Sequence, residues 1–93
     1  MGRPRQIYIS VPDTTYSLEV DLTRYDCLKE KPHCHVCNST GLRVGQVWLD
    51  SITFDSTPSK IANDDQNKIL STVHRSRQTL ESAFLYNREN GHD

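Results

Sequence analysis

The sequence has little apolar material for its length. Its 93 residues are 34% hydrophobic and 8% aromatic, and the mean hydropathy is −0.68. A chain this short buries only about 60–65% of the surface that its unfolded form exposes, so its core contributes little stability. Small domains of this kind usually gain stability from disulfides, a metal ion or a second subunit. We therefore expect one domain over residues 1–93, and we expect it to contain such a device.

The sequence also lacks export, membrane and disulfide signals. No apolar run approaches the roughly 20 residues that a membrane helix needs, and the start of the chain lacks the apolar run and cleavage site of a signal peptide. The cysteines number three, and an odd number argues against a disulfide framework. These absences predict an intracellular, cytoplasmic protein in a reducing setting, with no membrane partner.

Strong net charge and catalytic motifs are absent as well. The formal net charge is −1, so the chain as a whole is not attracted to polyanions. The one Cys-x-x-Cys pair has Asn38 after it, where haem attachment needs histidine, and it does not follow the strand pattern of a thioredoxin. There is no glycine-rich phosphate loop. We expect a protein that is not an enzyme and has no catalytic residue.

What the sequence does have is two clear periodicities. Apolar residues alternate with polar ones across residues 7–22, around a Pro-Asp-Thr-Thr turn, which predicts an antiparallel β-hairpin with Asp21 on its wet face. Residues 42–55 are again rich in β-favouring residues, with Gly45 placed as a bulge would be. They form either one long bent strand or a tight second hairpin.

The second periodicity is helical and covers residues 63–88. Asn63 is a candidate cap to which Gln66 can reach back, and Asn90-Gly91 is a stop signal within the tail, residues 89–93. An apolar stripe should lie across the sheet, and it consists of Ile69, Val73, Ser76, Leu80, Ala83 and Phe84. The predicted fold class is α+β: an N-terminal hairpin, an irregular Cys/His loop over residues 23–41, one or two further strands and a long C-terminal helix.

The segment KPHCHVCNSTG, residues 31–41, has the composition of a zinc knuckle. A Cys-x-x-Cys turn supplies two thiolates to a tetrahedral ion, and glycine lets the chain reverse. Residues 34–41 resemble half of the Cys-rich repeat of DnaJ-type chaperones, but the second pair of that family is absent, so no family follows. We predict one structural zinc ion, which is the stabilising device that the poor core requires. The predicted ligands are Cys27, Cys34, Cys37 and His33, with His35 and His74 as alternates for the fourth; His74 falls far from the apolar stripe of the helix.

Two surfaces are candidates for binding a macromolecule. A flexible basic arm, residues 1–6, contains Gly-Arg-Pro-Arg, which resembles the core of an AT-hook. With one flank of the helix it could meet nucleic-acid phosphates, and the residues concerned are Arg3, Arg5, Lys68, Arg75 and Arg77. The second surface consists of aromatic and apolar residues that do not fit the predicted core faces and are typical of protein interfaces, namely Tyr8, Tyr25, Trp48, Leu70, Leu85 and Tyr86. Of these, Trp48, Leu70, Leu85 and Tyr86 are the predicted interface residues. It also suits a homodimer.

Taken together, these features favour a small regulatory module that binds another protein and modulates or inhibits it. The alternative is a nucleic-acid-binding regulator of transcription that uses the arm and the basic helix flank.

Overall fold

The computed structural model of the chain describes residues 3–93. It shows the predicted α+β fold with a long C-terminal helix, and its antiparallel sheet has five strands, more than the three or four predicted. The strands lie in the sheet in chain order: β1 (Ile9–Ser10), β2 (Ser17–Glu19), β3 (His33–Cys37), β4 (Arg43–Trp48) and β5 (Thr53–Phe54). A short helix, α1 (Arg24–Lys29), joins β2 to β3, and α2 (Asn63–Asn90) follows β5.

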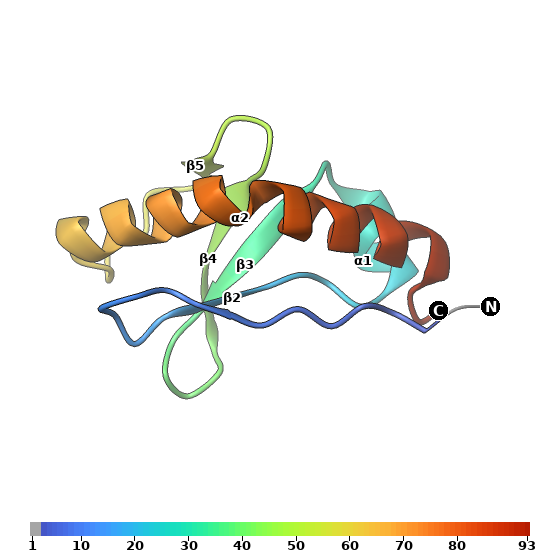
Figure 1. The fold of residues 1–93 in the computed structure, drawn as a ribbon, viewed down its shortest axis with the longest axis horizontal. Coiled ribbons are helices and arrows are strands. Elements are labelled where there is room, and N and C mark those ends of the chain that lie inside the picture. The colour runs from blue at the N-terminus through green and yellow to red at the C-terminus, as the bar shows by residue number, and fades with distance from the viewer. Residues whose placement is uncertain (1–2) are drawn as a thin grey trace.

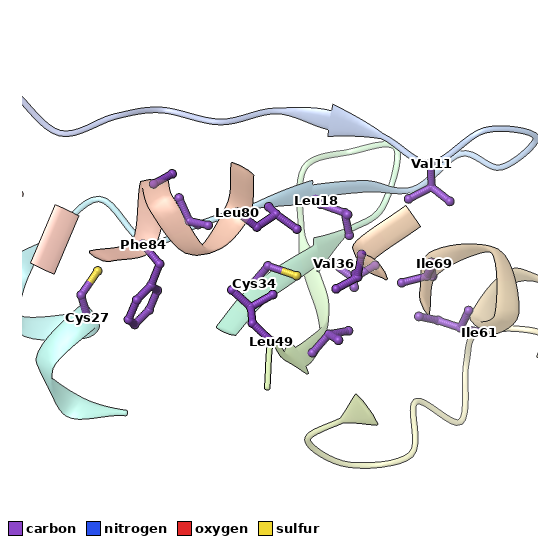
Figure 2. Packing of buried hydrophobic residues seen from close by; sticks show 14 residues of the cluster. Val11, Leu18, Cys27, Cys34, Val36, Leu49, Ile61, Ile69, Leu80 and Phe84 are labelled. Atoms are coloured by element: carbon purple, nitrogen blue, oxygen red, sulfur yellow. The ribbon is translucent and has the colours of Figure 1, made fainter. Parts of the chain in front are cut away.

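Helix α2 runs along the molecule and packs on one face of the sheet (Figure 1). Five residues of the predicted stripe are buried in the core: Ile69, Val73, Leu80, Ala83 and Phe84. They pack with apolar residues of the strands and with Leu49 and Ile61 (Figure 2). The apolar stripe of α2 and the inward face of the predicted hairpin therefore form most of the core.

Helix α2 starts at Asn63, as predicted, and ends at Asn90, two residues beyond the predicted end at residue 88. The helix begins after Ala62, and Asn63 makes no side-chain cap; the Gln66 side chain instead donates hydrogen bonds to the carbonyls of Pro58 and Ile61. At the other end the Gly91 N–H donates to the Asn87 carbonyl, as the stop signal predicts. A Cβ at Gly91 would lie 2.5 Å from the Asn87 oxygen and 2.6 Å from the Leu22 oxygen, so the close approach of these segments requires glycine.

The segment that we expected to be an irregular loop, residues 23–41, contains α1 and β3 instead. Thr23 caps α1: its Oγ1 accepts a hydrogen bond from the Asp26 N–H (3.1 Å) and donates one to the Asp26 carboxylate (2.8 Å). Strand β3 is central, with β2 on one side and β4 on the other. Because a central strand is buried on both faces, β3 lacks the alternation by which strands are recognised.

Residues 42–55 form the tight second hairpin rather than one bent strand. A turn at residues 49–52 joins β4 to β5, and the Ile52 N–H donates to the Trp48 carbonyl. The ladder between β3 and β4 shifts register where Val36 faces Gly45 and Cys37 faces Arg43, so the irregularity lies beside the predicted bulge position.

The predicted basic arm is only partly described, because Met1 and Gly2 lie outside the described residues. Arg5 is not free: its backbone N–H donates to Asn87 Oδ1 and its carbonyl accepts from Asn87 Nδ2 at 2.9 Å. Its guanidinium lies over the Tyr86 ring, 4.7 Å from the centroid. The N-terminal segment is thus held against the last turns of α2, near the C-terminus (Figure 1).

Candidate metal centre

Two neighbouring segments bring three potential metal ligands together. His33 and His35 are two residues apart on β3, so their side chains project from the same face of the strand. Glu19 of β2 pairs with His35, and Asp21 lies two residues further along the chain, in the direction of His33. The antiparallel arrangement therefore places Asp21 beside both histidines.

The contacts between these side chains are short. Asp21 Oδ2 lies 2.9 Å from His33 Nε2 and 3.0 Å from His35 Nε2. The three ligand atoms lie within 4.8 Å of one another, which is a spacing that one metal ion can span. Asp21 is 3% exposed and His33 is 1% exposed, whereas His35 is half-buried. The group is a buried carboxylate with two imidazole nitrogens directed at it.

Backbone and side-chain partners fix the orientation of His33 and of the Asp21 carboxylate. His33 Nδ1 lies 2.8 Å from the Lys31 carbonyl, and a carbonyl only accepts, so this nitrogen carries a proton. On the other side Arg43 Nη1 donates to Asp21 Oδ1 (2.9 Å), while Arg43 Nε donates to Glu19 Oε1 (3.0 Å). Metal-ligating histidines are commonly oriented in this way by a hydrogen bond from the second ring nitrogen.

Without a metal, the Asp21 carboxylate has hydrogen bonds to both imidazoles and an ion pair with Arg43. Burial would raise the pKa of Asp21, but the hydrogen bonds from His33 and His35 and the charge of Arg43 outweigh it and hold the pKa far below its usual value. Burial would lower the pKa of His33, but the hydrogen bonds to Asp21 and to the Lys31 carbonyl raise it. Asp21 is therefore ionised and ready to act as a ligand, and a metal ion must displace the proton on His33 Nε2.

The structure does not bring the predicted Cys₃His ligand set together. Among residues 3–93, the group of potential ligands that lie close enough to share an ion is Asp21, His33 and His35, and it includes no thiol. Cys34 and Cys37 are three residues apart on an extended strand rather than in a turn, so their side chains point to opposite faces and cannot chelate one ion. His33 and the alternate His35 are in the group, whereas the other alternate, His74, is exposed on α2, as its place away from the stripe predicts.

The three cysteines are free, buried thiols. Cys27 and Cys34 belong to the hydrophobic core (Figure 2), and burial raises their pKa to about 11 and about 12. Cys37 Sγ donates to Glu19 Oε1 at 3.0 Å; burial and this carboxylate raise its pKa to about 12. At neutral pH and without a metal all three stay protonated, and they act as packing and hydrogen-bonding groups.

Asp21 is the site residue that sequence reasoning missed. The alternation of residues 16–22 placed it on the wet face of a strand, where an acid needs no partner. The signal that could have found the site was the His-x-His spacing within a β-favouring segment, because residues two apart share a face of a strand. The Cys-x-x-Cys pair in the same residues instead predicts a turn, which hides the His-x-His spacing.

The Asp21–His33–His35 group lines a small pocket beside α1. Its volume is about 150 Å³, and Asp26, Lys29, Glu30, Arg43 and Gln46 complete the lining. Two imidazoles and a carboxylate are a donor set that suits zinc and other first-row divalent metals. The arrangement can therefore hold a metal ion.

The predicted nucleic-acid surface is dispersed. Lys68 and Arg75 line one pocket on a flank of α2, together with the turn between β1 and β2. Arg77 lies two positions after Arg75, a rotation of about 200°, and so faces the other side of the helix. Arg5 packs at the far end of α2, and Arg3 is exposed near it along the chain.

The predicted protein-interface residues are mostly engaged within the fold. Trp48, Leu70, Leu85 and Tyr86 are all half-buried, and Leu70 and Leu85 pack against the core. Lys31 Nζ lies over the Trp48 ring, 4.9 Å from its centroid. The large apolar side chains that are exposed are Tyr8 and Tyr25, which also belong to the predicted second surface, and Leu28, Leu42 and Val44.

No protein-family model, curated protein or solved structure matches this chain. Within the described residues, neither helix combines the length and the hydropathy needed to cross a lipid bilayer.

Proposed function

We propose that the protein is a non-catalytic, zinc-stabilised module in which Asp21, His33 and His35 hold the ion, and that it acts by binding another protein. The observation that carries the proposal is the convergence of both Nε2 atoms on one carboxylate oxygen, with His33 Nδ1 already bound to the Lys31 carbonyl. The second ring nitrogen of His33 is occupied, which leaves Nε2 as the atom that can bind the ion.

A structural role for the ion fits the size of the pocket. At about 150 Å³ it is smaller than the roughly 300–1,000 Å³ of most small-molecule sites, so it has room for a water as fourth ligand but little for a substrate. The ion would join the end of β2 to the central strand β3. Because such a site does not exist in the unfolded chain, the free energy of metal binding adds to the stability of the fold.

The surface beside the metal centre supports the protein-binding role. Tyr25 and Leu28 are three residues apart on α1, so they share one face of the helix, and they are 71% and 63% exposed. Exposed aromatic and apolar residues that lie together are typical of protein interaction sites. Asp26 and Lys29 of the same helix line the metal pocket, so an ion there would also hold this surface in place.

An intracellular setting fits the thiols. All three are reduced and buried, and the fold does not depend on a disulfide. The proposed mode of action is therefore modulation or inhibition of an intracellular partner protein through the face of α1.

The metal site is tested by replacing the ion with cobalt(II), whose absorption spectrum depends on its ligands. We expect visible bands from a site with nitrogen and oxygen ligands, without the intense near-ultraviolet band that thiolate ligands produce. His35→Ala should abolish cobalt binding, and Cys34→Ser should leave the spectrum unchanged. His74→Ala is the matched control, because His74 is an exposed histidine outside the site. A thiolate band that disappears in Cys34→Ser would instead restore the cysteine set.

The protein-binding role is tested separately, with the metal site intact. Immobilised wild-type protein should retain a specific partner from an extract of its own cells, and the double variant Tyr25→Ser, Leu28→Ser should not. Tyr8→Ser is the control, because Tyr8 is equally exposed, at 74%, but lies outside α1. Retention of the same partner by all three proteins would refute the assignment of the α1 face.

A further inference from the structure

A second pocket, separate from the metal centre, lies between α2 and the turn that joins β1 to β2. Its volume is about 280 Å³, at the lower end of the range for small-molecule sites. Asp13 lines it from the turn, and α2 contributes Asn67, Lys68, Ser71, Thr72 and Arg75. Pro12 also lines it from the turn; apart from Pro12 and the Asp13 carboxylate, the side chains that surround it are cationic or can donate hydrogen bonds.

The two cations of this pocket are held in place by neutral oxygens. Lys68 Nζ donates to the Asp13 carbonyl at 3.4 Å, and Arg75 Nη2 donates to Thr72 Oγ1 at 3.3 Å. Thr72 is itself buried and donates its hydroxyl proton to the Lys68 carbonyl at 2.8 Å, so its position is fixed. The neutral acceptors orient the cations and leave their charge uncompensated.

No carboxylate in residues 3–93 lies within ion-pair distance of Lys68 or Arg75. The cations of the metal pocket differ in this respect, because Arg43 pairs with Glu19 and Asp21, and Lys29 pairs with Asp26. With two cations against the single Asp13 carboxylate, the second pocket has a net positive charge. Arginine and lysine around a small pocket with hydroxyl donors are the groups that bind phosphate oxygens.

We propose that this pocket binds the phosphate group of a small phosphate monoester, with Lys68 and Arg75 as its charged partners and Ser71 and Asn67 as hydrogen-bond donors. The site goes beyond the proposed function, and it does not depend on the metal ion. The Asp13 carboxylate, which also lines the pocket and has the opposite charge, favours a ligand that carries a hydroxyl or amine beside its phosphate.

The distribution of the other cations argues against a nucleic-acid backbone as the ligand. Binding to a polyanion strengthens with the number of phosphates that are neutralised, and this needs a continuous track of cations. Arg77 faces the other side of α2, and Arg5 is packed on Tyr86. In the part of the chain that the structure describes, only two cations line this pocket, so no continuous track of cations leads away from it.

The test is a titration of the full chain with O-phosphoserine, followed by amide chemical shifts at constant ionic strength. We expect saturable shifts confined to the amides of Asp13 and of residues 67–75. Lys68→Gln and Arg75→Gln should each weaken binding by about fivefold or more, because each removes a charge-assisted hydrogen bond. Arg77→Gln is the matched control: it removes the same charge from the opposite face and should leave the affinity unchanged.

Serine without its phosphate should cause no shifts at the same concentrations, since the phosphate is the group recognised. The spectra also report whether each variant is folded, so a loss of binding is not confused with unfolding. The inference is overturned if O-phosphoserine causes no saturable shift, or if Arg77→Gln weakens binding as much as Arg75→Gln. It is overturned in favour of a polyanion surface if heparin binds in its place and its affinity falls steeply with salt.

Discussion

At the scale of single residues, Asp21 connects more of the fold than its place after a short strand indicates. Its carboxylate contacts His33 and His35 on β3 and Arg43 on β4. Its backbone carbonyl accepts hydrogen bonds from Asn87 Nδ2 on α2 (2.9 Å) and from Cys27 Sγ on α1 (3.6 Å). One residue thus links the sheet to both helices.

Replacing the Asp21 carboxylate should therefore destabilise the metal-free protein. Asp21→Asn leaves Arg43, His33 and His35 without their shared anion, and breaking a buried ion pair on one side costs about 3–5 kcal/mol. Urea unfolding in the presence of a chelator measures the loss. Asp50→Asn is the control, because Asp50 forms an exposed ion pair with Lys31, and such pairs contribute little. An equal effect of the two substitutions would contradict the network described here.

The cysteines should be inert in the folded protein. Burial raises the pKa of Cys27 to about 11 and that of Cys34 to about 12, so neither forms the reactive thiolate near neutral pH. A disulfide reagent added at pH 8 should label the native protein slowly and the urea-unfolded protein at once, with three thiols per chain. Rapid labelling of Cys34 in the native protein would show that this side chain does not lie in the core.

At the scale of elements, the sequence predicted the parts of the fold that have a periodic pattern. The hairpin and α2 each bury one face, so their apolar residues recur at intervals of two or of three to four. Helix α1 buries only Cys27, and six residues with one buried side chain have no readable stripe. Its one local signal was the Thr23-x-x-Asp26 capping pattern. Strand β3 is buried on both faces, and its cysteines and histidines predict a metal-binding loop instead of a strand.

The same scale explains why only part of the candidate site could be predicted. His33 and His35 are neighbours in sequence, so local reasoning found them, whereas Asp21 reaches them only through the pairing of β2 with β3. In a turn, the spacing of Cys34 and Cys37 would let both thiolates bind one ion. On strand β3 the same spacing directs the two side chains to opposite faces of the sheet. The register of the sheet, which a single sequence does not encode locally, decided the ligand set.

The docking of the N-terminal segment onto α2 should depend most directly on Asn87. Its fully buried side chain binds the backbone of Arg5 through Oδ1 and Nδ2 and the carbonyl of Asp21 through Nδ2. Asn87→Ala leaves these backbone groups without partners and should cost about 2–4 kcal/mol in the free energy of unfolding. Hydrogen exchange of the Arg5 amide should also accelerate in this variant.

Asn90→Ala is the matched control for this prediction. Asn90 lies one turn later on α2, and its side chain binds only the Tyr86 carbonyl within the same helix. It should lose little stability and leave the Arg5 amide protected. If Asn87→Ala behaves like Asn90→Ala, the N-terminal segment is not held by this contact.

At the scale of the whole molecule, stability depends on a small core and on polar connections around it. The core unites the inward faces of the strands with the stripe of α2, and it includes two of the three thiols. Among the described residues, no buried side-chain nitrogen or oxygen lacks a hydrogen-bond partner. The hydrogen bonds of the fold are therefore complete without a metal, and the proposed ion would add stability to this structure.

The most direct test of the proposed metal centre is thermal unfolding of the chelator-treated protein with and without added zinc. At a free zinc concentration about 100-fold above its dissociation constant, binding to the native state alone adds about 2.7 kcal/mol, which raises the Tm of a domain of this size by about 10–20 °C. His74→Ala should show the same shift and His35→Ala should show none. An unchanged Tm in the wild-type protein, or an equal shift in His35→Ala, would contradict a zinc site at Asp21, His33 and His35.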